Sequence, residues 1–380
     1  MDIRQKKRLT AIMSDMRRLT VEQDGSPCYE IVYTDSFDGL SAELEALGGK
    51  SRRICVITDT KVEKLYGKEV LARVLEVCPD ARMCVIPEGE EHKNLDTMAG
   101  IYRFLIENGY DRKSLLVALG GGVVGDMTGF AAATYLRGVD YVQVPTTLLS
   151  QADSSIGGKT GIDFEGYKNM IGAFRMPGLV YSNVSTLKSL DGRQFSSGFA
   201  EIMKHGLIRD DSYYEWLLEN MYEILGQESG VLQEMLLRSN QIKKEVVEAD
   251  PLEKGERRIL NLGHTIGHAI EKNSGFTLTH GECVALGCVA AAWISWKRDL
   301  IGMEDFYEIR DMFVPFGLPI CLEELNVEKV LALTKSDKKA ENGKINFVLL
   351  KGIGQAFVDD TVTDEEIRLA LKELIFAEEG

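Results

Sequence analysis

The sequence predicts an α/β N-terminal domain with a mostly parallel, Rossmann-like sheet, followed by an all-α C-terminal domain. Short apolar runs alternate with helical stretches in the first half of the chain, which is typical of a parallel sheet covered on both faces. From about residue 186 strand signals nearly vanish and long helical runs follow. The chain has 380 residues, more than one hydrophobic core usually serves, so two domains are expected.

The first domain is predicted to contain five strands, with helical stretches such as 94–108 between several of them. Residues 1–22 precede the domain and have the pattern of a basic amphipathic helix or arm. The α/β domain is therefore placed at 23–185. Its predicted strands are 29–33, 53–59, 83–87, 114–119 and 141–145.

The second domain, 186–380, is predicted to be helical almost throughout. It contains one isolated strand, at 345–350, and ends in an acidic helix at 363–379. Its other predicted helices are 196–208, 212–226, 229–249, 258–272, 280–298 and 304–316.

Composition excludes several classes of protein. The net charge of −15 argues against a nucleic-acid partner, and it means that an anionic substrate would need a local group of cations. No apolar run is long enough to span a membrane, and no apolar segment follows the basic start as in a signal peptide. The seven cysteines are scattered without zinc-ribbon spacing, which indicates free thiols and a cytoplasmic location.

A glycine-rich turn, Gly120–Asp126, directly follows the fourth predicted strand and opens a helix. It matches the G-x-G-x-x-G pattern, in which glycines let the backbone approach a pyrophosphate at a helix N-terminus. A tight structural turn is the alternative. Asp59, Glu90 and Lys93 follow the second and third strands and could complete a nucleotide site, although each alone is more often a solvated loop residue.

A polar loop around Lys159 is the candidate anion site. Gly157–Thr160 is similar to the end of a Walker A loop, but Asp153 stands where that motif needs a glycine, so a triphosphate loop is excluded. Lys168 and Asn169 follow. Cations and an amide in one loop suit a phosphate or a carboxylate, with a solvated loop as the alternative.

Histidine spacing predicts a metal site. His264 and His268 lie four apart on a predicted helix, and His280 begins the next helix after a Thr279–Glu282 capping box. Glu201, in an apolar and small stretch, is an attractive third ligand. His205 is its rival. Two histidines and a carboxylate would leave an open position, as in catalytic zinc sites, whereas hydrogen-bonded structural histidines are the alternative.

Taken together, these blocks resemble the 3-dehydroquinate synthase family over roughly residues 29–375. The resemblance depends on the order and combination of several blocks, because no single block is specific. The first 20 or so residues lie outside it, and Tyr167 stands where the family usually has a glycine. The matching blocks are 120–129, 131–138, 145–161, 198–204, 261–271, and 337–339 followed by Gly343.

The resemblance implies two cofactors, NAD and a zinc ion that cobalt could replace. The implied zinc ligands are Glu201, His264 and His280. The implied NAD-binding residues are Asp59, Glu90, Lys93, Gly121, Gly122, Val123, Asp126, Thr146, Thr147, Lys159 and Lys168.

It also implies a substrate site rich in cations. Arg137 matches a family arginine that reaches the neighbouring subunit's site, which implies a homodimer. Either Lys338 or the adjacent Lys339 would face the substrate. The implied substrate and catalytic residues are Asp153, Lys159, Lys168, Asn169, Lys204, Arg257, Asn261, His268, Lys338 and Arg137.

The activity implied is that of a lyase of the shikimate pathway, which supplies chorismate and the aromatic amino acids. The substrate would be 3-deoxy-D-arabino-heptulosonate 7-phosphate, a small anionic sugar phosphate. Transient oxidation by NAD, elimination of phosphate, re-reduction and an internal aldol closure would give 3-dehydroquinate. The alternatives are another sugar phosphate cyclase or a metal-dependent polyol dehydrogenase of the same architecture; His268 and Arg257 favour the synthase.

Overall fold

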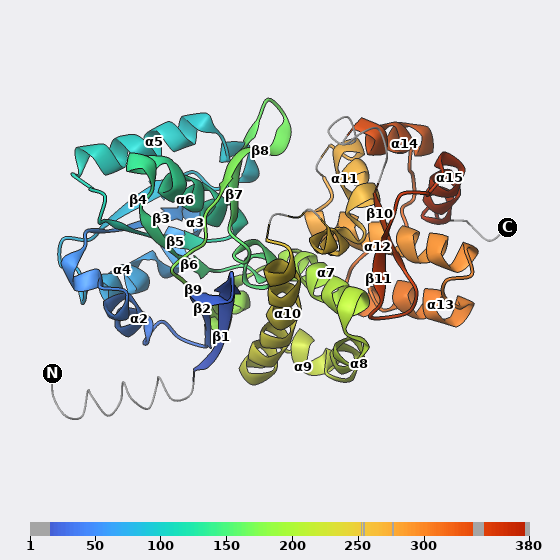
Figure 1. Ribbon diagram of the computed structural model, residues 1–380, viewed down its shortest axis with the longest axis horizontal. Helices are drawn as coiled ribbons and strands as arrows, with labels where there is room; N and C mark the ends of the chain where they lie inside the picture. Colours follow the sequence, from blue (N-terminus) through green and yellow to red (C-terminus); the bar gives the residue numbers. More distant parts are fainter. Residues whose placement is uncertain (1–15, 252, 254, 276, 337–345, 377–380) are drawn as a thin grey trace. The chain divides into compact units, whose positions relative to one another are not determined.

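The computed structural model describes residues 16–251, 253, 255–275, 277–336 and 346–376 (Figure 1). They form two compact units. Unit 1 runs to Ser189 and includes Leu232–Leu237, and unit 2 comprises Leu190–Val231 and the chain from Arg238 onward. The first unit thus extends four residues beyond the predicted boundary of 185.

A seven-stranded sheet forms the centre of unit 1, in the order β1-β2-β9-β6-β5-β3-β4. All neighbouring strands are parallel except β1 and β2. Five strands match the predicted ones, and two, β1 and β9, were not predicted. The strands are β1 (Arg17–Gln23), β2 (Ser26–Thr34), β3 (Ile54–Asp59), β4 (Arg82–Ile86), β5 (Leu115–Gly120), β6 (Asp140–Pro145) and β9 (Leu179–Asn183).

The predicted helix over 1–22 is wrong where it overlaps β1. Leu19 and Val21 are buried there and alternate with more exposed neighbours, which is the period of a strand. Pairing with β2 satisfies the backbone of this segment, so tertiary contacts prevail over its helical pattern. The first fifteen residues of the predicted helix lie outside the described part of the chain.

Helices cover both faces of this sheet (Figure 1). Helices α5 (Leu95–Glu107) and α6 (Gly122–Thr134) pack on one face, where their core includes Cys55 and Ile57 of β3. Helices α2 (Leu40–Ala46) and α4 (Lys68–Leu75) pack on the other, over Ile54 and Val56 of the same strand. Strand β3 is therefore apolar on both faces, as a central parallel strand requires.

A hairpin of β7 (Lys159–Phe164) and β8 (Tyr167–Phe174) projects from unit 1 as a separate two-stranded sheet (Figure 1). The prediction of an irregular loop here is wrong. Glu165 and Gly166 both have positive φ, at 48° and 80°, as a tight hairpin turn requires. Buried Thr160 and Ile162 anchor β7.

Unit 2 is mainly helical, and it shares α10 (Ser229–Ala249) with unit 1, to which Leu232–Leu237 of that helix belong. Its predicted strand is present but is paired with a second, β11, so the unit is not purely α. The predicted helix over 258–272 begins only at His264, because Glu256–Asn261 forms a 3-10 helix, η7. Helix α14 was not predicted. The elements are α7 (Gly192–Arg209), α8 (Asp211–Glu219), α9 (Met221–Leu225), α10 (Ser229–Ala249), α11 (His264–Asn273), α12 (His280–Lys297), α13 (Met303–Asp311), α14 (Val327–Ser336), β10 (Phe347–Leu350), β11 (Ala356–Asp359) and α15 (Asp364–Glu373).

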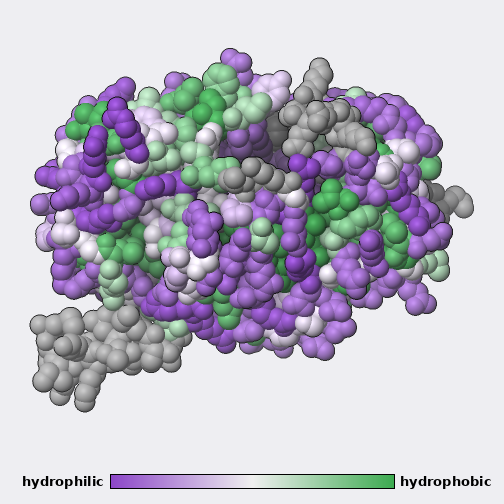
Figure 2. All heavy atoms as spheres, viewed as in Figure 1, coloured by the Kyte–Doolittle hydropathy of each residue, from purple (hydrophilic) through white to green (hydrophobic). Residues whose placement is uncertain are grey.

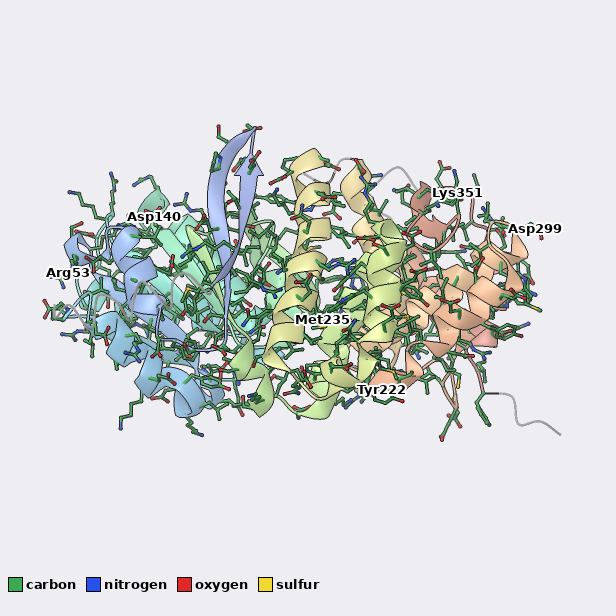
Figure 3. The ribbon with its side chains drawn as sticks, turned by 90° about the horizontal axis from the view of Figure 1, so that it is seen from below. Arg53, Asp140, Tyr222, Met235, Asp299 and Lys351 are labelled. Carbon is green, nitrogen blue, oxygen red and sulfur yellow. The ribbon has the colours of Figure 1, made fainter. Side chains whose placement is uncertain are left out.

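Helix α12 forms the centre of unit 2 and is buried along nearly its whole length. Met235 of α10 is fully buried, whereas Tyr222 of α9 is 78% exposed (Figure 3). On the face shown in Figure 2, hydrophilic residues predominate and apolar residues form only small patches. Among the described residues, no helix combines the length and the apolar character needed to span a bilayer.

Candidate active site

The glycine turn connects β5 to α6 in unit 1. Its glycines lie against neighbouring side chains: a Cβ on Gly121 would be 3.0 Å from Thr147 Cγ2, and one on Gly122 would be 3.1 Å from Ser154 Oγ. The first N–H groups of α6 have no partner within the helix and give its start a partial positive charge. The turn therefore has the properties of a site for a phosphate group.

The position of this turn in the sheet supports the same interpretation. Strand β5 lies between β3 and β6, while β4 lies on the far side of β3, so the direction of strand addition reverses between β3 and β5. Ligands of open parallel sheets bind at the carboxyl ends of strands beside such a reversal. Asp59 ends β3 at this edge, and Thr146 and Thr147 follow β6. Asp59 also caps the short helix α3 (Thr60–Val62), because its Oδ1 accepts from Lys61 N and Val62 N, each at 2.8 Å.

Two of the predicted residues, Asp126 and Asn169, contact a third, the buried Lys93. Lys93 is only 4% exposed, and its Nζ lies 2.6 Å from Asp126 Oδ2 and 2.5 Å from Asn169 Oδ1. Burial raises the pKa of Asp126 to about 6, and Lys93 opposes this only in part. Burial would lower the pKa of Lys93, but Asp126 and Glu90 raise it above its ordinary value. At neutral pH the two groups form an ion pair that also holds the β7–β8 hairpin through Asn169.

The remaining predicted residues of unit 1 are more accessible. Lys159 begins β7 and is exposed, and Lys168 of β8 places its Nζ 4.0 Å from Glu90 Oε1. Asp153 lies half-buried in the short π-helical turn Ser150–Ser154. Arg137 is exposed after α6 and has a φ of 70°. This conformation is uncommon for a residue with a side chain and marks the turn as constrained.

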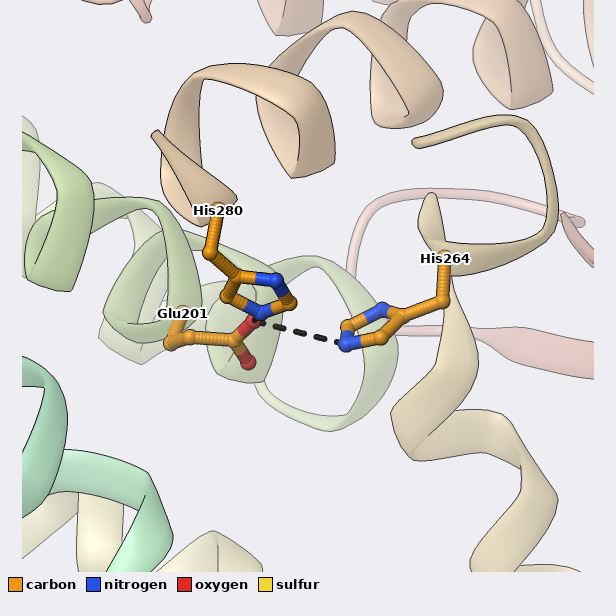
Figure 4. Close-up of side chains that lie close together, drawn as sticks. All are labelled: Glu201, His264 and His280. Atoms are coloured by element: carbon orange, nitrogen blue, oxygen red, sulfur yellow. Dashed lines mark hydrogen bonds and ion pairs between the residues drawn. The ribbon is translucent and has the colours of Figure 1, made fainter. Parts of the chain in front are cut away.

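In unit 2, Glu201 lies with His264 and His280 in one cluster (Figure 4). Glu201 comes from the middle of α7, and the two histidines are the first residues of α11 and α12. Glu201 Oε1 is 3.2 Å from His280 Nε2 and 3.5 Å from His264 Nε2. The ligand atoms of all three lie within 4.8 Å of one another. The rival His205 also has a ligand atom within 4.8 Å of one of Glu201, and its Nδ1 lies 2.7 Å from Ser239 Oγ.

Charge in this cluster is balanced by Lys204, one turn after Glu201 on α7. Glu201 is fully buried, Lys204 is 2% exposed, and the two form an ion pair. Burial would raise the pKa of Glu201, but Lys204 and the two histidines hold it well below its usual range. Burial and Lys204 lower the pKa of His264, whereas the hydrogen bond with Glu201 raises the pKa of His280 against its burial.

The cluster fits a divalent transition metal. His264 Nδ1 lies 3.1 Å from the Leu262 carbonyl oxygen, a bond that this nitrogen makes as a donor. The tautomer this selects leaves a lone pair on Nε2, the atom that faces Glu201. Two imidazole nitrogens and one carboxylate suit zinc or cobalt and leave coordination positions for a substrate.

The other predicted residues of unit 2 lie on the same elements. His268 is exposed one turn along α11, with its ring centre 5.1 Å from that of His264. Arg257, 2% exposed in η7, donates from Nη1 to the Pro251 carbonyl at 2.7 Å. Asn261 Nδ2 donates to Glu253 Oε1 at 2.9 Å. Lys338 and Lys339 lie outside the described residues.

Two buried charged residues of unit 2 were not among the predicted site residues. Glu271 is 5% exposed, and a ligand atom of it lies within 4.8 Å of those of His268 and His280. Its position three residues after His268 was the available signal, because this spacing places both on one face of a helix. Lys243 of α10 is 5% exposed. No spacing signal distinguished it from the neighbouring Lys244.

Family models match most of the chain. The model described as 3-dehydroquinate synthase N-terminal matches residues 83–197, and that described as 3-dehydroquinate synthase C-terminal matches 198–340. A 3-dehydroquinate synthase of Acetivibrio thermocellus is 47% identical over 316 residues, which are 83% of this chain and 88% of that protein. One of Nitrosospira multiformis is 46% identical over 308 residues, covering 81% and 84%.

Solved structures agree on the fold. A 2-epi-5-epi-valiolone synthase of Streptomyces hygroscopicus subsp. jinggangensis, with NAD+ and Zn2+ bound, has a TM-score of 0.84 at 28% identity and covers 94% of this chain and 99% of its own. A 2-deoxy-scyllo-inosose synthase complexed with carbaglucose-6-phosphate, NAD+ and Co2+ has a TM-score of 0.83 at 23% identity and covers 94% and 100%. The latter likeness concerns the fold alone.

Proposed function

This chain belongs to the 3-dehydroquinate synthase family, and we infer from that membership that it converts 3-deoxy-D-arabino-heptulosonate 7-phosphate into 3-dehydroquinate and phosphate. The observation that carries the inference is a match over more than four fifths of the chain that includes both the glycine turn and the Glu201–His264–His280 cluster. The reaction class proposed is that of a lyase that eliminates phosphate and closes a carbocycle.

Two cofactors supply the chemistry when bound. Bound NAD would supply a reversible hydride acceptor, so that the overall reaction is not a redox reaction, and bound zinc or cobalt would lower the pKa of a substrate hydroxyl. NAD+ with Zn2+ or Co2+ accompanies the solved relatives. The chain's own residues must hold both groups, bind the two anionic ends of the substrate and keep water out.

We assign the binding of NAD to unit 1. Gly121, Gly122 and Val123 present the free N–H groups at the start of α6 to the pyrophosphate. The Lys93–Asp126 pair fixes the helix that carries this turn to the β7–β8 hairpin, and Asp59, Glu90, Thr146 and Thr147 line the same edge of the sheet. Lys159 and Lys168, exposed on the hairpin, are the cations proposed for anionic groups.

We assign the binding of the metal ion to unit 2. Glu201, His264 and His280 are its ligands, and Lys204 holds the Glu201 carboxylate ionised and oriented. His268 is proposed to act by hydrogen bonding or proton transfer near the leaving phosphate. Arg257 and Asn261 are proposed substrate contacts. Lys243 adds a further buried cation to this unit.

The oligomeric state and the cellular location of the protein are proposed from the sequence. The proposal includes a homodimer in which Arg137 reaches the neighbouring subunit's site, supported by the constrained turn that exposes this residue. A cytoplasmic location is also proposed, on the composition of the sequence.

A single assay tests the function. The purified protein is incubated with the heptulosonate phosphate, zinc and catalytic NAD, and phosphate and dehydroquinate are measured together. Equal amounts of both products, with no net NADH, are expected. Phosphate release with a different carbocycle would indicate another sugar phosphate cyclase, and stoichiometric NADH without phosphate would indicate a polyol dehydrogenase.

A further inference from the structure

One face of α7 contacts the segment that begins α12 at three successive positions. Arg193, Ser197 and Glu201 are spaced by four residues, so their side chains lie along one side of the helix. Glu201 contacts His280, and Ser197 Oγ accepts from the Gly281 N–H at 3.0 Å. Arg193 contacts Glu282. Three consecutive residues of α12 are thus each held by one residue of this face.

The Arg193–Glu282 contact is bidentate. Arg193 donates from Nε to Glu282 Oε1 and from Nη2 to Oε2, both at 2.7 Å. Nη2 also donates to the Thr277 carbonyl at 2.8 Å, which ties the loop before α12 to the same guanidinium. Two parallel bonds fix the direction of the carboxylate as well as its distance.

Glu282 also fixes the backbone on either side of His280. Its Oε2 accepts from the Thr279 N–H at 2.7 Å, and the Glu282 N–H donates to Thr279 Oγ1 at 3.3 Å. This capping box encloses His280 and Gly281. A displacement of the Glu282 carboxylate would therefore change the start of α12, where the His280 side chain originates.

Helices α7 and α12 are in such close contact here that α12 cannot shift without moving against α7. A Cβ on Gly281 would lie 2.0 Å from the Ser197 carbonyl oxygen, a contact that only glycine permits. Backbone meets backbone one turn before Glu201 on α7 and one residue after His280 on α12. A small movement of α12 along α7 would alter the separation of the two ligands directly.

We propose that Arg193 is a positioning residue of the metal centre, whose ion pair with Glu282 keeps His280 in register with Glu201. This inference rests on the proposed metal-binding role of Glu201, His264 and His280. Arg193 is 53% exposed, so the pair contributes little to the stability of the fold. Its effect is expected instead on metal affinity, because groups that orient metal ligands typically change it by about 10- to 100-fold.

The test measures zinc affinity of the full chain by competition with a chromogenic chelator. Arg193→Ala is expected to weaken zinc binding by about tenfold. Arg193→Lys, which keeps the charge but not the two parallel bonds, should recover part of this loss. Glu282→Gln should weaken zinc binding to a similar degree, and adding Arg193→Ala to it should cause little further loss.

The chain offers a matched control at the other end of α12. Arg298 donates from Nε and Nη2 to Glu366 at 2.6 and 2.8 Å, and from Nη2 to the Thr361 carbonyl at 3.2 Å. Glu366 caps α15 with Thr363 as Glu282 caps α12 with Thr279. Arg298→Ala should lower thermal stability at least as much as Arg193→Ala and leave zinc affinity unchanged.

The possible outcomes distinguish the positioning role of Arg193 from the proposed metal-binding role of Glu201, His264 and His280. Zinc binding by Arg193→Ala equal to that of the unaltered protein would overturn the positioning role and leave the metal centre in place. Equal weakening by Arg298→Ala would overturn it too, because the effect would then reflect general loosening of unit 2. Absence of zinc binding by the unaltered protein would overturn the metal centre itself. If Arg193→Ala does not fold, Arg193→Lys and Glu282→Gln decide the same question.

Discussion

Replacing Glu201 by glutamine tests both the metal centre and the charge balance around it. The change keeps the shape of the side chain and removes its negative charge. Zinc binding and dehydroquinate formation are expected to be lost together, because one of three ligands is gone and its amide is a weak substitute. The metal-free protein should also lose stability, since Lys204 would remain buried without the carboxylate that forms its ion pair.

The expected loss of stability in the metal-free protein follows from the burial of Glu201 and Lys204. Glu201 is 0% exposed and Lys204 is 2% exposed, so water cannot replace the lost partner. Removing one member of such a pair typically costs about 3–5 kcal/mol. Domains of this kind are stable by roughly 5–15 kcal/mol, so the loss should be large but leave the chain folded at 25 °C. Changing Lys204 to methionine in addition should recover part of it, because no charge is then left buried.

The measurements are urea unfolding at pH 7 without metal, zinc content after dialysis, and the shift of the melting temperature on adding zinc. Glu43→Gln is the control: Glu43 is also a buried acid, but its partner Arg18 is 28% exposed and belongs to unit 1. It should keep full zinc binding and lose less stability. A metal-free Glu201→Gln protein as stable as the original, or one that retains zinc, would refute the reasoning.

Three further predictions concern the cofactor, the metal and acid stability. Lys93→Met should weaken NAD binding by about tenfold or more in calorimetry, because it leaves Asp126 buried without its cation and releases the hairpin; unchanged affinity would show that this pair does not shape the cofactor site. A strong chelator should abolish turnover but not NAD binding, and zinc or cobalt should restore turnover; activity that survives complete metal removal would contradict the metal's role. The hydrogen bonds from Arg298 lower the pKa of Glu366 from 4.5 to about 2, so the stabilisation that this pair gives is complete above about pH 5 and should be lost as the pH falls toward 2. Glu366→Gln should flatten this part of the stability curve, and an unchanged slope would refute the assignment.

Local patterns predicted those elements whose stability is local. The glycine turn at Gly120–Asp126 was placed correctly between a strand and a helix, because its glycines and the following helix start are neighbours in sequence. The Thr279–Glu282 capping box was also predicted and is present. Each depends on bonds within four residues, which the order of amino acids specifies without reference to the rest of the fold.

Prediction failed where distant segments decide the structure. Leu19 and Val21 are in a strand because β2 is available to pair with them, not because of their own propensity. The β7–β8 hairpin was not predicted, because its many polar and glycine residues show no clear alternation of apolar and polar positions. Lys243 could not be distinguished from its neighbour Lys244 because only tertiary packing buries it.

In the candidate site, too, local sequence specified some features and tertiary packing specified the others. Spacing alone determined that His264 and His268 share a helix face and that His280 starts a helix, and the residue types determined that a metal could be held. Only the tertiary structure brought Glu201 to His280, 79 residues away, and to His264. It also aligned Arg193, Ser197 and Glu201 against the start of α12. Ligand geometry depends on how two helices pack, and packing is a property of surfaces distant in sequence rather than of any local pattern.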